Sequence, residues 1–121
     1  MADSLTVYTY AKCSTCRDAT AWLREQGISF VEKPIRETPP SVGELRRMLD
    51  RQKGQLRRLF NTSGIEYRAQ KLAEKLPNMS EAEALELLSS DGRLVKRPFV
   101  LGPKVGLVGF DPKRWKEALK A

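Results

Sequence analysis

The order of the first three expected elements constrains the fold more than any other feature of the sequence. Residues 5–10 (LTVYTY) are rich in β-branched and aromatic residues, which predicts a strand. A helical pattern follows and ends at Gly27, and Thr15 and Asp18 have the spacing of a capping box. Residues 28–31 (ISFV) predict a second strand. Strand, helix and strand in this order form a βαβ unit with two parallel strands.

The middle of the chain carries helical patterns. Ser41 with Glu44 has capping-box spacing and predicts a helix start. Ser80 with Glu83 repeats this spacing and predicts another. Weaker helical spacing lies between them, over residues 66–76. We therefore expect several helices after the βαβ unit.

The pattern changes to strands near the end of the chain. Residues 94–95 and 99–101 flank Lys96-Arg97-Pro98 and together predict one strand. Residues 105–108 predict a second strand, and the tight turn between the two makes a β-hairpin. Asp111-Pro112 then predicts the start of a last helix.

A βαβ half followed by a ββα half is the arrangement of a thioredoxin-like α/β fold with a mixed four-stranded sheet. The helices over about residues 41–90 then form a helical insertion between the two halves. A chain of 121 residues suits one domain and can bury one modest core. We expect residues 1–121 to form a single domain of this kind.

The sequence Cys13-Ser14-Thr15-Cys16 lies where the first strand meets the first helix. The free N–H groups and the dipole of a helix start stabilise a thiolate, and Lys12 and Arg17 add positive charge beside it. Such sites lower a cysteine pKa from about 8.5. We expect Cys13 to be the exposed nucleophile and Cys16 the buried resolving thiol of a redox pair.

Three other interpretations of the cysteines compete with this one. A zinc site usually takes four ligands, but the chain has two cysteines and no histidine, so we expect no metal. A reducing cytosol disfavours a structural disulfide. Inert packing is the third alternative, against which the Cys-x-x-Cys pattern beside a βαβ unit argues. The absence of histidine also excludes Ser-His-Asp and Cys-His catalysis.

Arg97-Pro98 is the second candidate feature and has two interpretations. Pro98 lies at the head of a predicted strand, where a cis peptide bond would place the pair opposite the cysteines. Arg97 would then bind an oxyanion or a carboxylate with two hydrogen bonds. The alternative is an ordinary strand start with a solvated arginine. Both remain open at this point.

The formal net charge of +7 favours anionic partners. The basic run between residues 44 and 60 is typical of a solvated helix face, so we expect no direct binding of nucleic acid. The first ten residues lack the pattern of a secretory leader, and no apolar run is long enough for a membrane helix. We therefore expect a cytoplasmic protein without membrane association.

Four short motifs in this order resemble the arsenate reductase/Spx family. They are CSTCR (residues 13–17), ETPP (37–40), KRP (96–98) and VGF (108–110). The resemblance spans nearly the whole chain and implies a thioredoxin-like fold with a helical insertion. It is closer to the Spx-like members with Cys-x-x-Cys than to true arsenate reductases, which place Asn-Pro shortly before the cysteine where this chain has Tyr10-Ala11-Lys12.

The resemblance implies two functions. In the first, the chain is a thiol-disulfide oxidoreductase with Cys13 as nucleophile, Cys16 as resolving thiol, and Lys12, Arg97 and Pro98 at the substrate. It would bind no cofactor and would take electrons from glutathione or glutaredoxin. In the second, it is an Spx-like redox-switched regulator that binds the C-terminal domain of the RNA polymerase α subunit near Gly54.

Overall fold

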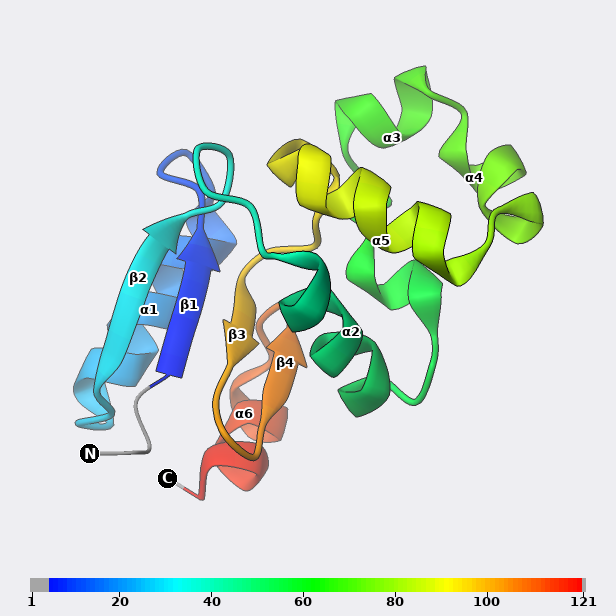
Figure 1. The fold of residues 1–121 in the computed structure, drawn as a ribbon. Coiled ribbons are helices and arrows are strands. Elements are labelled where there is room, and N and C mark those ends of the chain that lie inside the picture. The colour runs from blue at the N-terminus through cyan, green and yellow to red at the C-terminus, as the bar shows by residue number, and fades with distance from the viewer. Residues whose placement is uncertain (1–4, 121) are drawn as a thin grey trace.

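A four-stranded mixed sheet forms the centre of the computed structural model, which describes residues 5–120 (Figure 1). The strands lie in the order β2-β1-β3-β4. Strand β1 pairs parallel with β2 and antiparallel with β3, which pairs antiparallel with β4. Their bounds are β1 Leu5–Thr9, β2 Phe30–Pro34, β3 Phe99–Leu101 and β4 Gly106–Val108. The α/β fold class with a mixed four-stranded sheet is thus confirmed.

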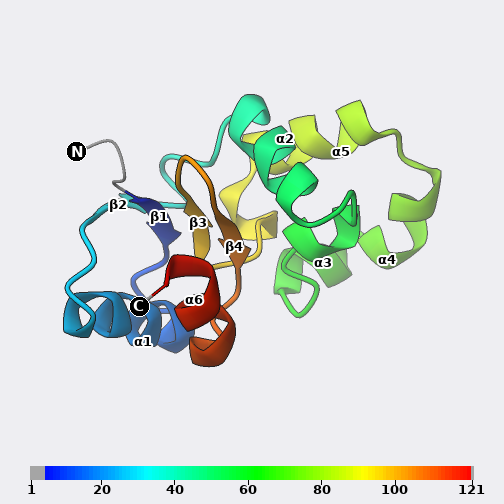
Figure 2. The same ribbon diagram turned by 90° about the horizontal axis from the view of Figure 1, so that it is seen from below.

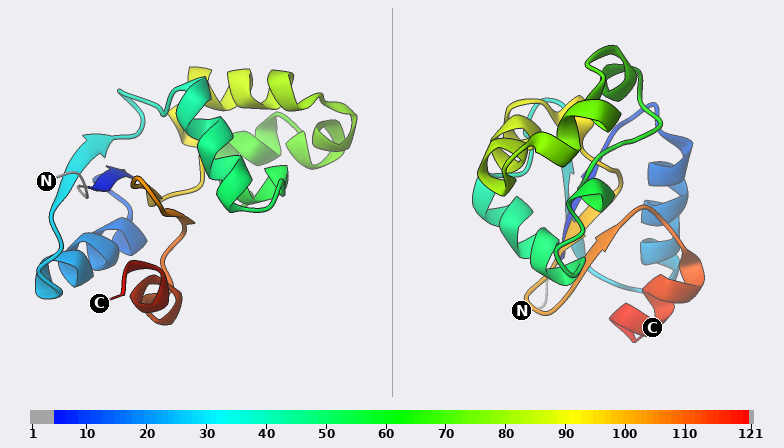
Figure 3. Two further views of the ribbon diagram at one scale, coloured as in Figure 1. Left: turned by 60° about the horizontal axis from the view of Figure 1, so that its bottom comes forward. Right: turned by 90° about the vertical axis from the view of Figure 1, so that its right-hand side faces the viewer.

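The helices divide between the two sides of the sheet. Helices α1 and α6 cover one face, and α2 to α5 gather on the other side (Figures 2 and 3). The α-helices are α1 Ser14–Glu25, α2 Val42–Arg51, α3 Ile65–Ala69, α4 Leu72–Lys75, α5 Glu81–Ser90 and α6 Pro112–Leu119. Short 3-10 turns are η1 Leu56–Leu59, η2 Leu76–Asn78 and η3 Gly92–Leu94. In chain order, helices α2 to α5 follow β2 and precede β3, where the sequence predicts the insertion.

Alternating side chains of the central strands build two separate cores. Val7 and Val100 pack with α1 and the buried Trp115 of α6. Tyr8 and Phe99 point the other way and pack with the buried side chains of α2 and α5. Because successive strand residues face opposite sides of a sheet, this alternation fixes the register of β1 against β3.

Local capping signals explain where three helices begin. Ser41 and Glu44 form a reciprocal capping box at the start of α2, and Ser80 and Glu83 form one at the start of α5. The Asp111 side chain accepts hydrogen bonds from the first turn of α6. These three predicted starts are confirmed.

Two predicted strands have wrong bounds. The second strand runs over Phe30–Pro34 and not over residues 28–31, because β2 is an edge strand whose side chains are mostly exposed and show little apolar alternation. Strand β3 begins at Phe99, because residues 92–94 form the turn η3 and Val95 bridges to Phe60 instead. Within residues 5–120, no helix has the length and apolar character needed to cross a bilayer.

Candidate redox site

Cys13 is the N-cap residue of α1. Its Sγ accepts a hydrogen bond from the backbone N–H of Cys16, with 3.3 Å between the two atoms. The predicted capping box of Thr15 and Asp18 is therefore wrong, because Ser14 is already the first helical residue. The cysteine sulfur takes the place that a serine or aspartate oxygen usually occupies at a helix start. This position joins the sulfur directly to the free N–H groups of the helix.

The loop before Cys13 is held by backbone acceptors. The Cys13 N–H donates to the Tyr10 carbonyl at 3.0 Å, and the Arg17 guanidinium donates to the Ala11 carbonyl at 2.9 Å. Lys12 is exposed on this loop, and it is not among the groups that shift the pKa of Cys13. Of the two cations predicted beside the sulfur, Arg17 thus binds the loop backbone and Lys12 projects to the surface.

The surroundings of Cys13 favour the thiolate. Partial burial alone would raise the pKa of Cys13, but hydrogen bonds from the Cys16 side chain and backbone lower it. The Arg97 guanidinium lowers it further through a hydrogen bond and its charge. These effects together leave the pKa of Cys13 below the ordinary cysteine value. The half-exposed sulfur is therefore both ionisable and accessible.

Cys16 has the opposite environment. The residue is 2% exposed, and its thiol is free, as is that of Cys13. Burial raises the pKa of Cys16, and the neighbouring Cys13 raises it further through a hydrogen bond and its charge. The pair thus holds one acidic outer sulfur and one protonated inner sulfur, one helical turn apart.

Arg97 and Pro98 lie at the same corner of the fold as the cysteines. The peptide bond between Arg97 and Pro98 is cis, and Pro98 is buried. Arg97 is half-buried, and its Cζ lies 4.9 Å from the ring centroid of Tyr10. Of the two interpretations of this pair, the structure thus has the cis form with the arginine beside the Cys13 sulfur.

Two residues of this corner have no signal in the sequence. The Arg36 guanidinium also lies over Tyr10, with 3.9 Å between Cζ and the ring centroid. Tyr10 therefore contacts two cations and also accepts the N–H of Cys13. Only the fold brings Arg36, which follows β2, to the end of β1.

Gly54 lies away from this corner. It occupies the loop between α2 and η1, at the opposite end of α2 from the loop that carries Cys13 (Figure 1). Its φ is +76°, and no atom lies within 4 Å of the place where a Cβ would stand. Gly54 is thus an exposed turn glycine on a separate surface.

Within residues 5–120, no group of three or more cysteine, aspartate or glutamate side chains is placed to hold a metal ion. The chemistry that this corner offers is that of its own sulfurs. A thiolate can attack an electrophilic sulfur or oxyanion, a second thiol one turn behind can displace the product, and a guanidinium can hold an anion beside them.

Comparisons with known proteins agree with this geometry. The model of the ArsC family matches residues 8–118. The protein YusI of Bacillus subtilis is 47% identical over 114 residues, which cover 94% of this chain and 97% of YusI. The global transcriptional regulator Spx of Enterococcus faecalis is 33% identical over 88% of this chain and 80% of Spx.

A solved structure supports the same assignment. The crystal structure of a putative ArsC family related protein from Bacteroides fragilis has a TM-score of 0.90 and 38% identity. It covers 98% of this chain and 99% of that protein. With most of its length matched by the family model and by these relatives, the chain belongs to the ArsC family.

Proposed function

We propose that this protein is a thiol-disulfide oxidoreductase in which Cys13 attacks and Cys16 resolves. The observation that supports this most is the opposed environment of the two sulfurs. The pKa of Cys13 is lowered by Cys16 and Arg97, whereas burial raises the pKa of Cys16. A pair of this kind supplies a nucleophile at neutral pH and keeps the second thiol in reserve.

In the first step, the Cys13 thiolate attacks one sulfur of a substrate disulfide. A bond forms between the Cys13 Sγ and that sulfur, the substrate S–S bond breaks, and the other substrate sulfur leaves as a thiolate. The negative charge of Cys13 disappears in this mixed disulfide. Because that charge is one cause of the raised pKa of Cys16, the inner thiol then loses its proton more readily.

In the second step, the Cys16 thiolate attacks the Cys13 sulfur. The Cys13–Cys16 disulfide forms, and the second substrate sulfur leaves as a thiolate. The substrate has then gained two electrons and the protein has lost two. Two molecules of glutathione, or one glutaredoxin dithiol, restore the free thiols by the same exchange and become oxidised themselves.

Arg97 gives the site a preference for anionic substrates. Its guanidinium is half-buried beside Cys13, and Arg36 adds a second cation at the same tyrosine. A carboxylate of a glutathione disulfide would accept hydrogen bonds from such a guanidinium. We propose disulfides of small anionic thiols as the substrate class. Glutathione disulfide serves as the probe of a single turnover, because glutathione as electron donor is itself oxidised to that disulfide.

Mass spectrometry of trapped intermediates tests this proposal. The wild-type protein treated with oxidised glutathione should gain an internal disulfide and release glutathione. Cys16→Ser should stop at a mixed disulfide between Cys13 and glutathione, and Cys13→Ser should form neither product. Ser14→Ala is the control at an exposed neighbour and should behave as wild type. A mixed disulfide at Cys16 in the wild-type protein would contradict the assigned roles.

The second candidate function is a redox-switched regulator. The similarity to Spx, a global transcriptional regulator, and the open surroundings of Gly54 favour it. In this function the Cys13–Cys16 disulfide would alter a surface that binds the C-terminal domain of the RNA polymerase α subunit. The protein would then form a complex with that domain and would not turn over glutathione disulfide.

A pull-down with the α-subunit domain separates the two functions. Gly54→Arg should abolish a complex that depends on this loop. Gly27→Arg is a matched control, because Gly27 is also exposed, has a φ of +69° and has no atom within 4 Å of its Cβ position. Both variants carry the same backbone strain and the same new charge. Equal loss in both variants, or no complex with wild type, would exclude the regulator.

A further inference from the structure

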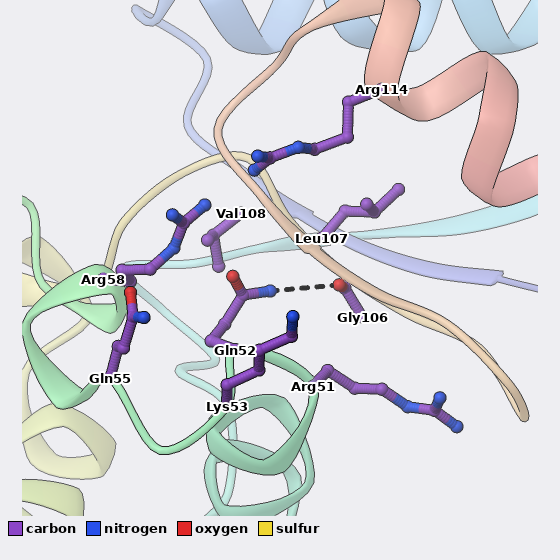
Figure 4. Close-up of a pocket in the computed structure, with 9 residues that line it drawn as sticks. All are labelled: Arg51, Gln52, Lys53, Gln55, Arg58, Gly106, Leu107, Val108 and Arg114. Atoms are coloured by element: carbon purple, nitrogen blue, oxygen red, sulfur yellow. Dashed lines mark hydrogen bonds between the residues drawn. The ribbon is translucent and has the colours of Figure 1, made fainter.

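A second cationic site lies along the open edge of the sheet, outside the redox corner. It is a pocket of about 330 Å³. Strand β4 forms its floor, the end of α2 and the turn η1 form one wall, and α6 contributes from the other side (Figure 4). Its lining comprises Arg51, Gln52, Lys53, Gln55, Arg58, Gly106, Leu107, Val108 and Arg114. Neither cysteine nor Arg97 belongs to it.

Three cationic side chains converge on this pocket. In Figure 4 the guanidinium groups of Arg58 and Arg114 point toward one another above Val108, and Lys53 ends beside Gln52 and Gly106 at the floor of the same pocket. Arg51 points away from them. The three converging cations come from three separate elements, and the lining contains no carboxylate.

The positions of these cations are not explained by the fold itself. Within residues 5–120, none of the three forms an ion pair with an acidic side chain. Arg114 stands in the first turn of α6, where the helix dipole disfavours positive charge. Lys53 has a φ of +59°, a conformation that usually favours glycine. Like charges held together in this way repel one another until an anion is bound between them.

Backbone groups at the floor of the pocket can also contact a ligand. The Gln52 amide donates to the Gly106 carbonyl at 3.1 Å, which ties the end of α2 to β4. In this antiparallel pair, Leu107 directs its backbone N–H and C=O groups toward β3. Because the direction alternates along a strand, the backbone groups of its neighbours Gly106 and Val108 face away from β3. Their N–H groups therefore face the open edge, where they can donate hydrogen bonds to an anion.

We propose that this pocket binds the phosphate group of a small phosphorylated ligand. Two guanidinium groups and one ammonium match a doubly charged oxyanion, whose oxygens accept paired hydrogen bonds from arginine. The volume accommodates a diphosphate or the phosphates of a nucleotide. The described lining has no aromatic side chain on which a base of single-stranded nucleic acid would stack.

Calorimetric titration tests the site with inorganic pyrophosphate, ATP and malonate as probes. Pyrophosphate and ATP should bind saturably with one site per chain, and malonate should bind more weakly. Arg58→Ala and Arg114→Ala should each weaken pyrophosphate binding about tenfold, the value of one charge-assisted contact. Arg68→Ala removes an exposed arginine outside the pocket and should leave binding unchanged. ATP binding tighter than pyrophosphate identifies a nucleotide as the source of the phosphate, and equal binding identifies the inorganic anion.

Backbone amide shifts measured by NMR locate the bound pyrophosphate. Lys53, Gly106 and Val108 should shift on titration, and Cys13 should not. Cys13→Ser and Arg97→Ala should keep the binding, so that a failure of the redox proposal leaves this result intact. The proposal is overturned if no saturable binding occurs, if malonate binds as tightly, if Arg68→Ala weakens binding equally, or if Arg97→Ala abolishes it.

The thermal stability of the same variants gives an independent measurement. Pyrophosphate should raise the Tm of the wild-type protein and not that of the Arg58→Ala, Arg114→Ala double variant. Without any phosphate at low salt, the double variant should be at least as stable as wild type, because repulsion between the two guanidinium groups is removed. A lower Tm of the double variant in the absence of ligand would show that the arginines serve the fold and would overturn the proposal.

Discussion

Arg97 lies over the ring of Tyr10, with 4.9 Å between the guanidinium carbon and the ring centroid. The same guanidinium lowers the pKa of Cys13. Tyr10 also accepts the Cys13 N–H through its carbonyl. One residue of the loop after β1 therefore holds both the nucleophile and the cation that activates it.

The first prediction concerns the ring of Tyr10. Tyr10→Ala should free Arg97 from its position and raise the pKa of Cys13, because the cation–π contact that holds the guanidinium is lost. Tyr10→Phe keeps the ring and should leave the pKa unchanged. Thiolate absorbance followed across pH measures both variants. Equal pKa values in wild type and Tyr10→Ala would show that the ring does not position the arginine.

The second prediction concerns the charge of Arg97. Arg97→Gln removes a group that favours the thiolate, so the pKa of Cys13 should rise toward the free-cysteine value of about 8.5. The rate of Cys13 alkylation should then fall at neutral pH and recover above pH 8.5. Arg97→Lys keeps the charge without the planar donors, so its Cys13 pKa should lie between those of the wild-type protein and Arg97→Gln. Arg68→Gln, at an exposed position on α3, is the control for loss of charge alone.

Much of the fold follows from local signals in the sequence. Ser41, Ser80 and Asp111 each start a helix because their side chains accept backbone N–H groups, which is a property of a few neighbouring residues. The bounds of β2 do not follow from such signals. Its exposed side chains carry no burial pattern, and its pairing with β1 is a property of the tertiary structure.

The candidate site likewise has one part that local sequence signals predict and one part that depends on the tertiary structure. The Cys-x-x-Cys pattern at a strand-to-helix junction places both sulfurs at the start of α1, since the helix geometry alone decides this. The contacts of Tyr10 with Arg36 and Arg97 join residues that are far apart in the chain. Only the assembled sheet brings them together, so no periodicity or spacing indicates them. The Thr15 capping box failed because the cysteine sulfur caps the helix in its place.

The third prediction concerns the close approach of Gly92 to the backbone of Ile35, the residue that follows β2. Gly92 is buried, and a Cβ added there would overlap the backbone of Ile35. Gly92→Ala should therefore destabilise the protein by about 3 kcal/mol, as overpacking against backbone does. Gly43→Ala is the control, because Gly43 is exposed in α2 and its nearest atom lies 3.9 Å away. It should stabilise the protein by about 0.5–1 kcal/mol. Urea unfolding measures both, and equal stabilities would contradict the close contact.

The fourth prediction links the two cysteines to the pH dependence of stability in the reduced protein. The folded state forms the Cys13 thiolate at lower pH than the unfolded chain, so stability should rise with pH up to about 8.5. Above that pH the unfolded chain ionises both thiols, whereas folded Cys16 keeps its proton, and stability should fall by at most about 1.4 kcal/mol per pH unit. Cys16→Ala should turn this maximum into a plateau between about pH 8.5 and 9.5, because the remaining thiol is then ionised in both states. Denaturant unfolding at a series of pH values measures the curve, and a maximum retained in Cys16→Ala would show that another group causes the decline.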